Sequence, residues 1–181
     1  MLSEIFTRLS GVVTDSGGEV YRYVGDALIA TRPVGAPKAN ADAIGCLFAC
    51  QEALKGAASD LLERYGHVPA FRAGLHAGPL VAGEIGGFKR EIALLGDTMN
   101  TAARIEQACR TTGHALLVSK PLLERSVMPA NIVARSIGEH LLRGKSEPIE
   151  LFALEHATTE QVENDTRGAW ALAGRGIGKG C

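Results

Sequence analysis

The sequence lacks a long hydrophobic run, an excess of charge of one sign and a metal-ligand pattern of cysteines, and each absence excludes a class of protein. No apolar stretch reaches the roughly 18 residues that a membrane-spanning helix needs. The formal net charge is −1, which gives no general electrostatic reason to bind a nucleic acid polymer. Three of the four cysteines fall in predicted helices, namely Cys46, Cys50 and Cys109. We interpret them as small core residues, which fits a reduced, cytosolic setting.

A secretory signal and internal repeats are also missing. The chain starts with a mixed amphipathic segment, so we expect a cytoplasmic protein, with membrane contact only through an N-terminal region outside this sequence. Of the 181 residues, 46% are hydrophobic and 22% are charged, which is typical of a globular domain with its own core. We expect the domain to span residues 1–155, and the polar, glycine-rich residues 156–181 to form a disordered tail.

Local patterns in the first half of the chain predict two helices and two β-hairpins. Apolar residues recur at helical spacing in the helices, and Gly-Asp or Gly-Pro turns separate the short β-prone runs. In chain order, the elements are a helix over residues 2–13, a hairpin of 19–23 with 27–31, a helix over 40–65, and a hairpin of 71–76 with 80–85. Asp26 would lie at the tip of the first hairpin, where an Asp can also serve turn chemistry alone.

The centre of the sequence predicts a buried strand, a tight turn and a helix in direct succession. Residues 92–95 are an apolar run of strand length, Gly96 ends it, and Asp97 is a good N-cap for the helix that follows. Further elements are expected after that helix, namely strands at 115–118, 132–137 and 149–154, with a short helix opening at Pro121. This order predicts an α+β fold in which helices cover a mainly antiparallel sheet.

The central helix has an apolar stripe and an opposite polar face. Ala102, Ile105 and Cys109 form the stripe, because they recur at intervals of three and four residues. Asn100 and Arg104 are four residues apart, so they share the face opposite the stripe. On spacing alone, this face is either an ordinary solvated surface or a place where an amide and a guanidinium meet a ligand together.

Residues 96–104, GDTMNTAAR, resemble the motif G-D/N-T-V-N-x-A-S/A-R of the class III nucleotide cyclases. The resemblance covers residues 1–155 and implies the ferredoxin-like cyclase homology fold. It also implies conversion of ATP to 3′,5′-cyclic AMP and pyrophosphate in intracellular signal transduction. By the same resemblance, Asn100 orients the ribose of the nucleotide, and Arg104 stabilises charge on the phosphates in the transition state.

Residues 17–26 resemble the family segment G-G-x-x-x-K-x-x-G-D. Its last residue, here Asp26, is in the family one of two carboxylates that hold two Mg²⁺ ions, with Mn²⁺ as an alternative. The Lys of adenine-selective members is replaced by Arg22, and many members carry Asp at the position of Ala93. The resemblance therefore determines the choice between ATP and GTP only weakly, and prevalence among bacterial members favours ATP.

Residues 141–145 resemble a basic family stretch, L-K-G-K/x, whose first Lys contacts nucleotide phosphates. Arg143 takes that position, so the charge is kept while the shape changes. A basic loop beside a strand is the alternative interpretation. His76 lies in a further family segment, residues 71–79, and is expected to be a structural His hydrogen-bonded in the sheet rather than a metal ligand or a base.

One family segment has no counterpart in this sequence. The opening strand of the family carries the other metal-binding Asp, and it would precede Asp26 by more than the 25 residues present here. We therefore expect a cyclase domain that lacks its first strand and helix. Family members work as dimers in which one subunit supplies the Asp pair and the other the Asn and Arg, and a homodimer is expected because this chain carries both kinds of residue. The alternative is a catalytically inactive cyclase-like module that dimerises or binds nucleotide.

Overall fold

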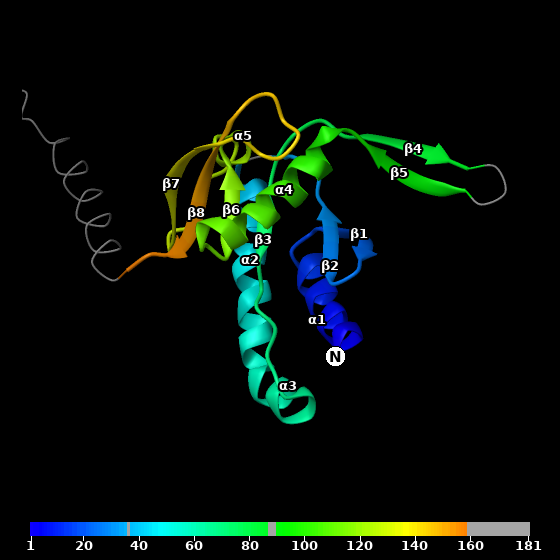
Figure 1. Ribbon diagram of the computed structural model, residues 1–181, viewed down its shortest axis with the longest axis vertical. Coiled ribbons are helices and arrows are strands. Elements are labelled where there is room, and N and C mark those ends of the chain that lie inside the picture. The colour runs from blue at the N-terminus through cyan, green and yellow to red at the C-terminus, as the bar shows by residue number, and fades with distance from the viewer. Residues whose placement is uncertain (36, 87–89, 159–181) are drawn as a thin grey trace, which may run out of the picture.

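The computed structural model describes residues 1–35, 37–86 and 90–158, and its centre is a four-stranded sheet. The strand order is β3 (Ala73–Leu75), β6 (Leu116–Ser119), β8 (Ile149–His156) and β7 (Ile132–His140). β3 runs parallel to β6, whereas the other two pairs are antiparallel (Figure 1). The expected α+β fold with a mainly antiparallel sheet is confirmed.

Helices cover both faces of this sheet, with α2 on one face and α4 on the other (Figure 1). The bounds of the helices are, in chain order, α1 (Leu2–Asp15), α2 (Pro37–Gly56), α3 (Ala58–Tyr65), α4 (Asp97–Thr112) and α5 (Lys120–Leu123). Among the described residues, none of these helices combines the length and the apolar composition that crossing a membrane requires.

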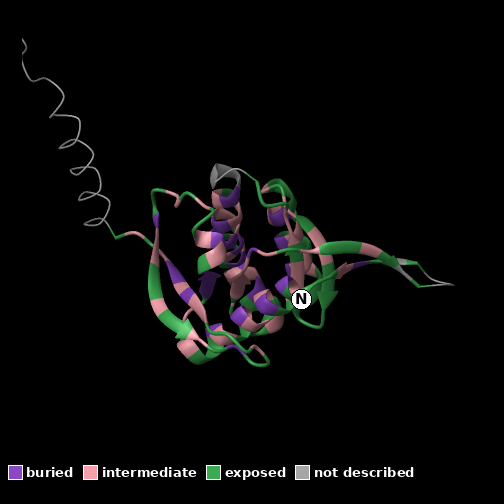
Figure 2. Cartoon of the chain, turned by 90° about the horizontal axis from the view of Figure 1, so that it is seen from above, coloured by how far each residue is buried: buried purple, intermediate pink, exposed green. Residues whose placement is uncertain are grey.

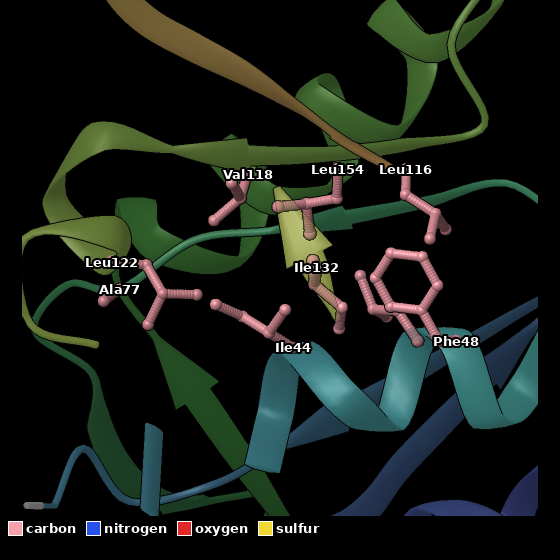
Figure 3. Close-up of a cluster of buried hydrophobic side chains, with 9 residues drawn as sticks. Ile44, Phe48, Ala77, Leu116, Val118, Leu122, Ile132 and Leu154 are labelled. Atoms are coloured by element: carbon pink, nitrogen blue, oxygen red, sulfur yellow. The ribbon is translucent and has the colours of Figure 1, made fainter. Parts of the chain in front are cut away.

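Strand β6 is the centre of two hydrophobic clusters because its side chains alternate between the two faces of the sheet. Leu116 and Val118 belong to the cluster under α2, whereas Leu117 belongs to the cluster under α4. Figure 3 shows the first cluster, in which Ile44 and Phe48 of α2 face the sheet. Full burial of one such side chain contributes about 1.5–3 kcal/mol, so β6 holds both helical layers onto the sheet.

A third cluster joins α1 to α2 and α3, and its buried members are Ile5, Leu9, Cys50, Leu54, Ala57 and Leu61. The cysteines of the described chain fit the expectation of small core residues. Cys50 and Cys109 are buried, Cys46 is partly buried, and all three are free thiols.

Gly74 brings α4 close to the sheet. A Cβ atom at this position of β3 would lie 2.4 Å from the backbone nitrogen of Glu106 and 2.7 Å from the backbone oxygen of Ala102. Any larger residue would push α4 outward, because both obstacles are backbone atoms. The position of the helix that carries Asn100 and Arg104 therefore depends on this glycine.

Two hairpins of the described chain lie outside the four-stranded sheet. β1 (Glu19–Val24) pairs with β2 (Ala27–Thr31), and β4 (Val81–Ile85) pairs with β5 (Glu91–Leu95) in an arm that projects from the body of the domain (Figure 1). Buried residues gather inside the body (Figure 2). The arm instead exposes more than half of three apolar side chains, which are Val81, Ile92 and Leu95.

The expected hairpin of residues 71–76 with 80–85 is wrong. β3 pairs with β6, and β4 pairs with β5. The Gly78–Pro79 segment does not turn back but runs along the start of α4, where the Thr98 hydroxyl donates to the Pro79 carbonyl at 2.6 Å. A Cβ at Gly78 would come within 2.5 Å of that hydroxyl oxygen. Packing against α4 therefore overrides the local turn signal.

Several boundaries also differ from the expectation. The single helix expected over 40–65 is two helices, α2 and α3, which meet at the helix-weakening Gly56. Strand β8 includes His156, expected to open the tail, and the ring of His156 packs on Phe48 with centroids 4.6 Å apart. The rest of the expected tail, residues 159–181, lies outside the described residues.

Candidate functional site

Helix α4 begins in a tight turn after β5 and presents its polar residues away from the sheet. Gly96 has a φ of 137°, which favours glycine, and it forms the N-cap in place of the expected Asp97. Ile105 is fully buried against the sheet. Asn100 is exposed and Arg104 partly exposed on the other side of the helix, as the helical spacing predicted.

These two residues line a cavity of about 350 Å³ between α4 and the loop that joins β7 to β8. The lining consists of Asn100, Ala103, Arg104, Gln107, Arg143 and Gly144. Two guanidinium groups share this space, and none of these six residues is acidic. Guanidinium groups fork onto phosphate or carboxylate oxygens, so the cavity is suited to a ligand with several negative charges.

The loop that carries Arg143, residues 141–148, is anchored on both sides of that residue. Leu142 is buried in the cluster under α4, together with Ile105 and Leu117. The backbone N–H of Lys145 donates to the Leu142 carbonyl at 3.0 Å and closes a turn around Arg143. The backbone position of Arg143 is therefore set by the hydrophobic core as well as by the loop.

An ion pair joins this loop to the first residue of α4. Lys145 is 20% exposed, and its ammonium group pairs with the carboxylate of Asp97, which is 67% exposed. A negative charge is also favoured at this end of a helix by the helix dipole. Because Asp97 is largely solvated, the pair adds at most about 1 kcal/mol to stability. Its main effect is geometric, because it holds the Arg143 loop beside α4.

Gly144 allows the Arg104 guanidinium to lie against the loop. Its φ of +70° is one that L-residues rarely adopt, and a Cβ there would lie 3.3 Å from Arg104 Nη2. Glycine therefore serves both the backbone conformation and the space that the guanidinium occupies. As a result, Arg104 from the helix and Arg143 from the loop reach the same cavity.

The other predicted site residues do not line this cavity. Asp26 is exposed at the tip of the β1–β2 hairpin, directly after Gly25, which has a φ of 62°. Arg22 is exposed on β1, with its Cζ 5.1 Å from the centroid of the Tyr21 ring. Ala93 is buried in β5. Three of the six predicted site residues, Asn100, Arg104 and Arg143, thus meet in one cavity. The other three lie on the two hairpins.

The match to a known family decides how the cavity is interpreted. The family model of the adenylate and guanylate cyclase catalytic domain matches residues 1–156. The chain belongs to this family. The resemblance seen in residues 96–104 is thereby confirmed.

Individual relatives of this cyclase domain agree with the assignment. Adenylate cyclase 2 of Rhizobium meliloti (strain 1021) is 38% identical over 153 residues, which cover 84% of this chain and 42% of that protein. The crystal structure of the adenylyl cyclase CyaB from P. aeruginosa has a TM-score of 0.74 at 20% identity, covering 87% of this chain and 82% of that chain. The guanylate cyclase domain of RhGC from Catenaria anguillulae, in complex with GTP, has a TM-score of 0.64 at 19% identity, covering 87% and 82%. The chain spans less than half the length of the curated relatives that it matches.

Asp26 is the one predicted metal ligand of the cyclase domain. In the part of the chain that the structure describes, no three His, Cys, Asp or Glu side chains are grouped so as to hold a metal ion. Enzymes hold Mg²⁺ with one or two carboxylates, phosphate oxygens and water. The exposed Asp26 carboxylate therefore fits the role of one Mg²⁺ ligand, and it does not form a metal site by itself.

His76 has a structural position in the domain. Its Nδ1 lies 2.7 Å from the hydroxyl oxygen of Ser119 in β6. Burial lowers the pKa of His76, and the positive charges of Lys145 and Arg125 lower it further. A neutral imidazole hydrogen-bonded to the sheet agrees with the expected structural role.

Gln107 at the cavity and the ion pair beside it were not predicted from the sequence. Gln107 lies one turn beyond Arg104, and the spacing rule that pairs Asn100 with Arg104 would have included it. The ion pair of Lys145 with Asp97 has no local sequence signal, because the two residues are far apart along the chain.

Proposed function

We propose that this cyclase domain converts ATP to 3′,5′-cyclic AMP and pyrophosphate. The observation that carries the proposal is the cavity in which Asn100, Arg104 and Arg143 meet. In this reaction the ribose 3′-oxygen bonds to the α-phosphorus, the bond from that phosphorus to pyrophosphate breaks, and the 3′-hydroxyl proton is released. Negative charge builds up on the phosphate oxygens as the pyrophosphate leaves.

Three polar residues of the cavity have a role in that reaction. Arg104 and Arg143 donate charge-assisted hydrogen bonds to the phosphates, with Arg104 acting on the charge that develops in the transition state. Comparable arginines in other phosphoryl-transfer enzymes are worth about 10³–10⁵ in rate. Asn100 lies one turn before Arg104 on the same face, and its amide orients the ribose so that the 3′-oxygen is in line.

We propose that the complete site is formed between two copies of the chain. Asp26 acts as one ligand of Mg²⁺, or of Mn²⁺, and a bound divalent ion supplies charge that activates the hydroxyl and steadies the phosphates. Asp26 does not line the cavity of its own chain, so in a homodimer it would serve the Asn100 and Arg104 of the other protomer. The exposed apolar side chains of the β4–β5 arm support this, because a second copy could cover them.

ATP is proposed as the preferred nucleotide, with GTP accepted less well. A relative named adenylate cyclase supports ATP, whereas a structural neighbour holds GTP, so the choice depends on this chain's own residues. Arg22 and Ala93 are the proposed base-reading positions. Because Ala93 offers no hydrogen-bonding side chain, the preference for ATP should stay below about 10³-fold, or about 4 kcal/mol. Competition between the two nucleotides in one assay measures it.

A catalytically inactive module that binds nucleotide or dimerises is the second candidate function. It needs only the cavity lined by Asn100, Arg104 and Arg143, whereas turnover also needs Mg²⁺ ligands in addition to Asp26. The two candidates differ in turnover, because only the enzyme requires a complete composite site.

Arg104→Ala tests the proposal in a mixture of two chains. The partner is a homologous cyclase domain that keeps both metal-binding carboxylates and carries Ala at the counterpart of Arg104. We expect cyclic AMP from the wild-type chain in this mixture, and at least about 100-fold less from Arg104→Ala. Arg110→Ala, exposed on the same helix and outside the cavity, is the matched control and should keep the wild-type rate.

Equal turnover by Arg104→Ala and Arg110→Ala would contradict the role of Arg104. Nucleotide binding without any turnover in the wild-type mixture would favour the inactive module instead.

A further inference from the structure

The β1–β2 hairpin contains a bulge at Tyr21. Val20 pairs with Ala30 and Arg22 pairs with Ile29, so two steps along β1 match one step along β2, and Tyr21 has no partner in the register. A bulge of this kind redirects the side chain of the extra residue and is common beside functional sites.

The redirected side chain reaches strand β5 of the arm. The Tyr21 hydroxyl donates to the Ile92 carbonyl at 3.2 Å and accepts from the Leu94 N–H at 3.2 Å. A phenol can make both bonds at once, because it has one donor hydrogen and acceptor lone pairs. The two backbone groups belong to the residues on either side of Ala93, so the hydroxyl fixes the backbone around that position.

The Tyr21 ring also contacts the second base-reading position. The Arg22 guanidinium lies over the ring, with its Cζ 5.1 Å from the centroid. This distance is within the range of a cation–π interaction. One side chain thus contacts Arg22 through its ring and the backbone around Ala93 through its hydroxyl.

We propose that Tyr21 is a positioning residue for recognition of the purine base. The inference rests on the proposed function, in which Arg22 and Ala93 are the base-reading positions. Tyr21 fixes the separation of these positions by holding β1 to β5. Its hydroxyl also pairs with the Ile92 carbonyl and the Leu94 N–H on the edge of β5, so these two backbone groups do not compete with Arg22 for the base.

Tyr21→Phe tests the inference, because it keeps the ring and its contact with Arg22 and removes only the hydroxyl. Tyr23→Phe is the matched control. It removes a hydroxyl from the same strand whose 2.8 Å hydrogen bond goes to Ser10 of α1 rather than to β5. The measurement is equilibrium binding of ATP, GTP and inorganic tripolyphosphate to the 181-residue chain. Tripolyphosphate has no base, so it reports on the phosphate cavity alone.

We expect Tyr21→Phe to weaken binding of the better-bound nucleotide by about fivefold or more, the effect of losing one or two hydrogen bonds. Tripolyphosphate binding should stay within about twofold of wild type, and Tyr23→Phe should leave all three ligands within about twofold. Unchanged nucleotide binding in Tyr21→Phe would overturn the inference. An equal loss for tripolyphosphate would also overturn it, because a general structural defect would then explain the result.

Amide hydrogen exchange at Leu94 gives a readout that needs no ligand. Exchange should be about fivefold faster in Tyr21→Phe and unchanged in Tyr23→Phe, and equal exchange in both variants would overturn the inference even if the proposed function holds. If the wild-type chain binds neither nucleotide nor tripolyphosphate, the proposed function fails, and the base-recognition role fails with it.

Discussion

The cavity between α4 and the Arg143 loop and the tip of the β1–β2 hairpin are built in opposite ways. The cavity is bordered by α4 and the Arg143 loop, both of which are anchored in the cluster around Ile105 and Leu142. Asp26 lies exposed at the end of a two-stranded hairpin outside the main sheet. The groups suited to an anion are therefore preorganised within one chain, whereas the carboxylate suited to a metal stands apart from them.

In the proposed dimer, this difference assigns phosphate binding to the cavity of one chain and metal binding to the hairpin tip of the other chain. Preorganised donors act on phosphates without further rearrangement, and this is where electrostatic stabilisation is most effective. The hairpin tip must be brought to a nucleotide by association with another copy. Changes in the cavity should therefore alter binding of inorganic tripolyphosphate to a single chain, and changes elsewhere should not.

Gly144→Val should have the largest effect on the cavity. The substitution places a β-branched side chain at a φ of +70° and against the Arg104 guanidinium. Gly66→Val is the matched control, because Gly66 has a φ of +77° with no atom within 4 Å of the added Cβ. Each variant should lose about 1–2 kcal/mol of stability from the backbone conformation. Only Gly144→Val should also weaken triphosphate binding, by about 10- to 100-fold, as titration calorimetry would measure.

Equal triphosphate affinity in the two glycine variants would break the comparison. Arg104 would then not depend on the loop for its position.

Lys145→Met should have an intermediate effect. It removes the ion pair with Asp97, which is largely solvated, so the Tm should change little. Triphosphate binding should fall about three- to tenfold, because the Arg143 loop is held less firmly beside α4. Lys120→Met removes the same charge and an exposed ion pair with Glu150 elsewhere, and it should leave binding unchanged. If both Lys variants lose the same affinity, the effect is one of net charge and not of loop position.

A pH titration of stability should show the smallest effect. Burial lowers the pKa of His76 in the folded chain. At a pH between this lowered pKa and the ordinary His value, the unfolded chain therefore binds a proton that the folded chain does not bind. This contribution to stability is present above the unfolded value of about 6.5 and is lost as the pH falls toward the lower folded pKa. Tm should therefore drop slightly more between pH 8 and pH 5 in wild type than in His76→Asn. Parallel Tm profiles would show that His76 does not contribute.

The fold could be predicted from local patterns only as far as contacts stayed local. The helix periodicity of residues 2–13 and the order of strand, turn and helix over residues 92–112 were found because neighbouring residues determine them. The expected burial of the strand at 92–95 is wrong, because β5 lies in the β4–β5 arm, where Ile92 and Leu95 are more than half exposed. The partner of β3 could not be found, because it pairs with the distant β6 and the Gly78–Pro79 segment packs on Thr98 instead of turning.

The candidate site divides in the same way. Asn100 and Arg104 could be placed on one helical face by their spacing, and the family resemblance added Arg143 to the same function. Sequence spacing contained no signal for the ion pair of Lys145 with Asp97. Nor did it contain one for the hydrogen bonds of Tyr21 to β5, because tertiary structure alone brings these residues together.

The most direct test of the account is tripolyphosphate binding to a single chain after both cavity arginines are removed. The test variant is Arg104→Ala with Arg143→Ala. The control is Arg110→Ala with Arg135→Ala, which removes the same charge from exposed positions outside the cavity. Because a hydrogen bond to a charged group contributes about 1.5–3 kcal/mol, we expect at least about a 100-fold weaker affinity in the test variant. The control should stay within about threefold of wild type. Equal affinities in the two double variants would contradict the claim that this cavity is the phosphate site of the cyclase domain.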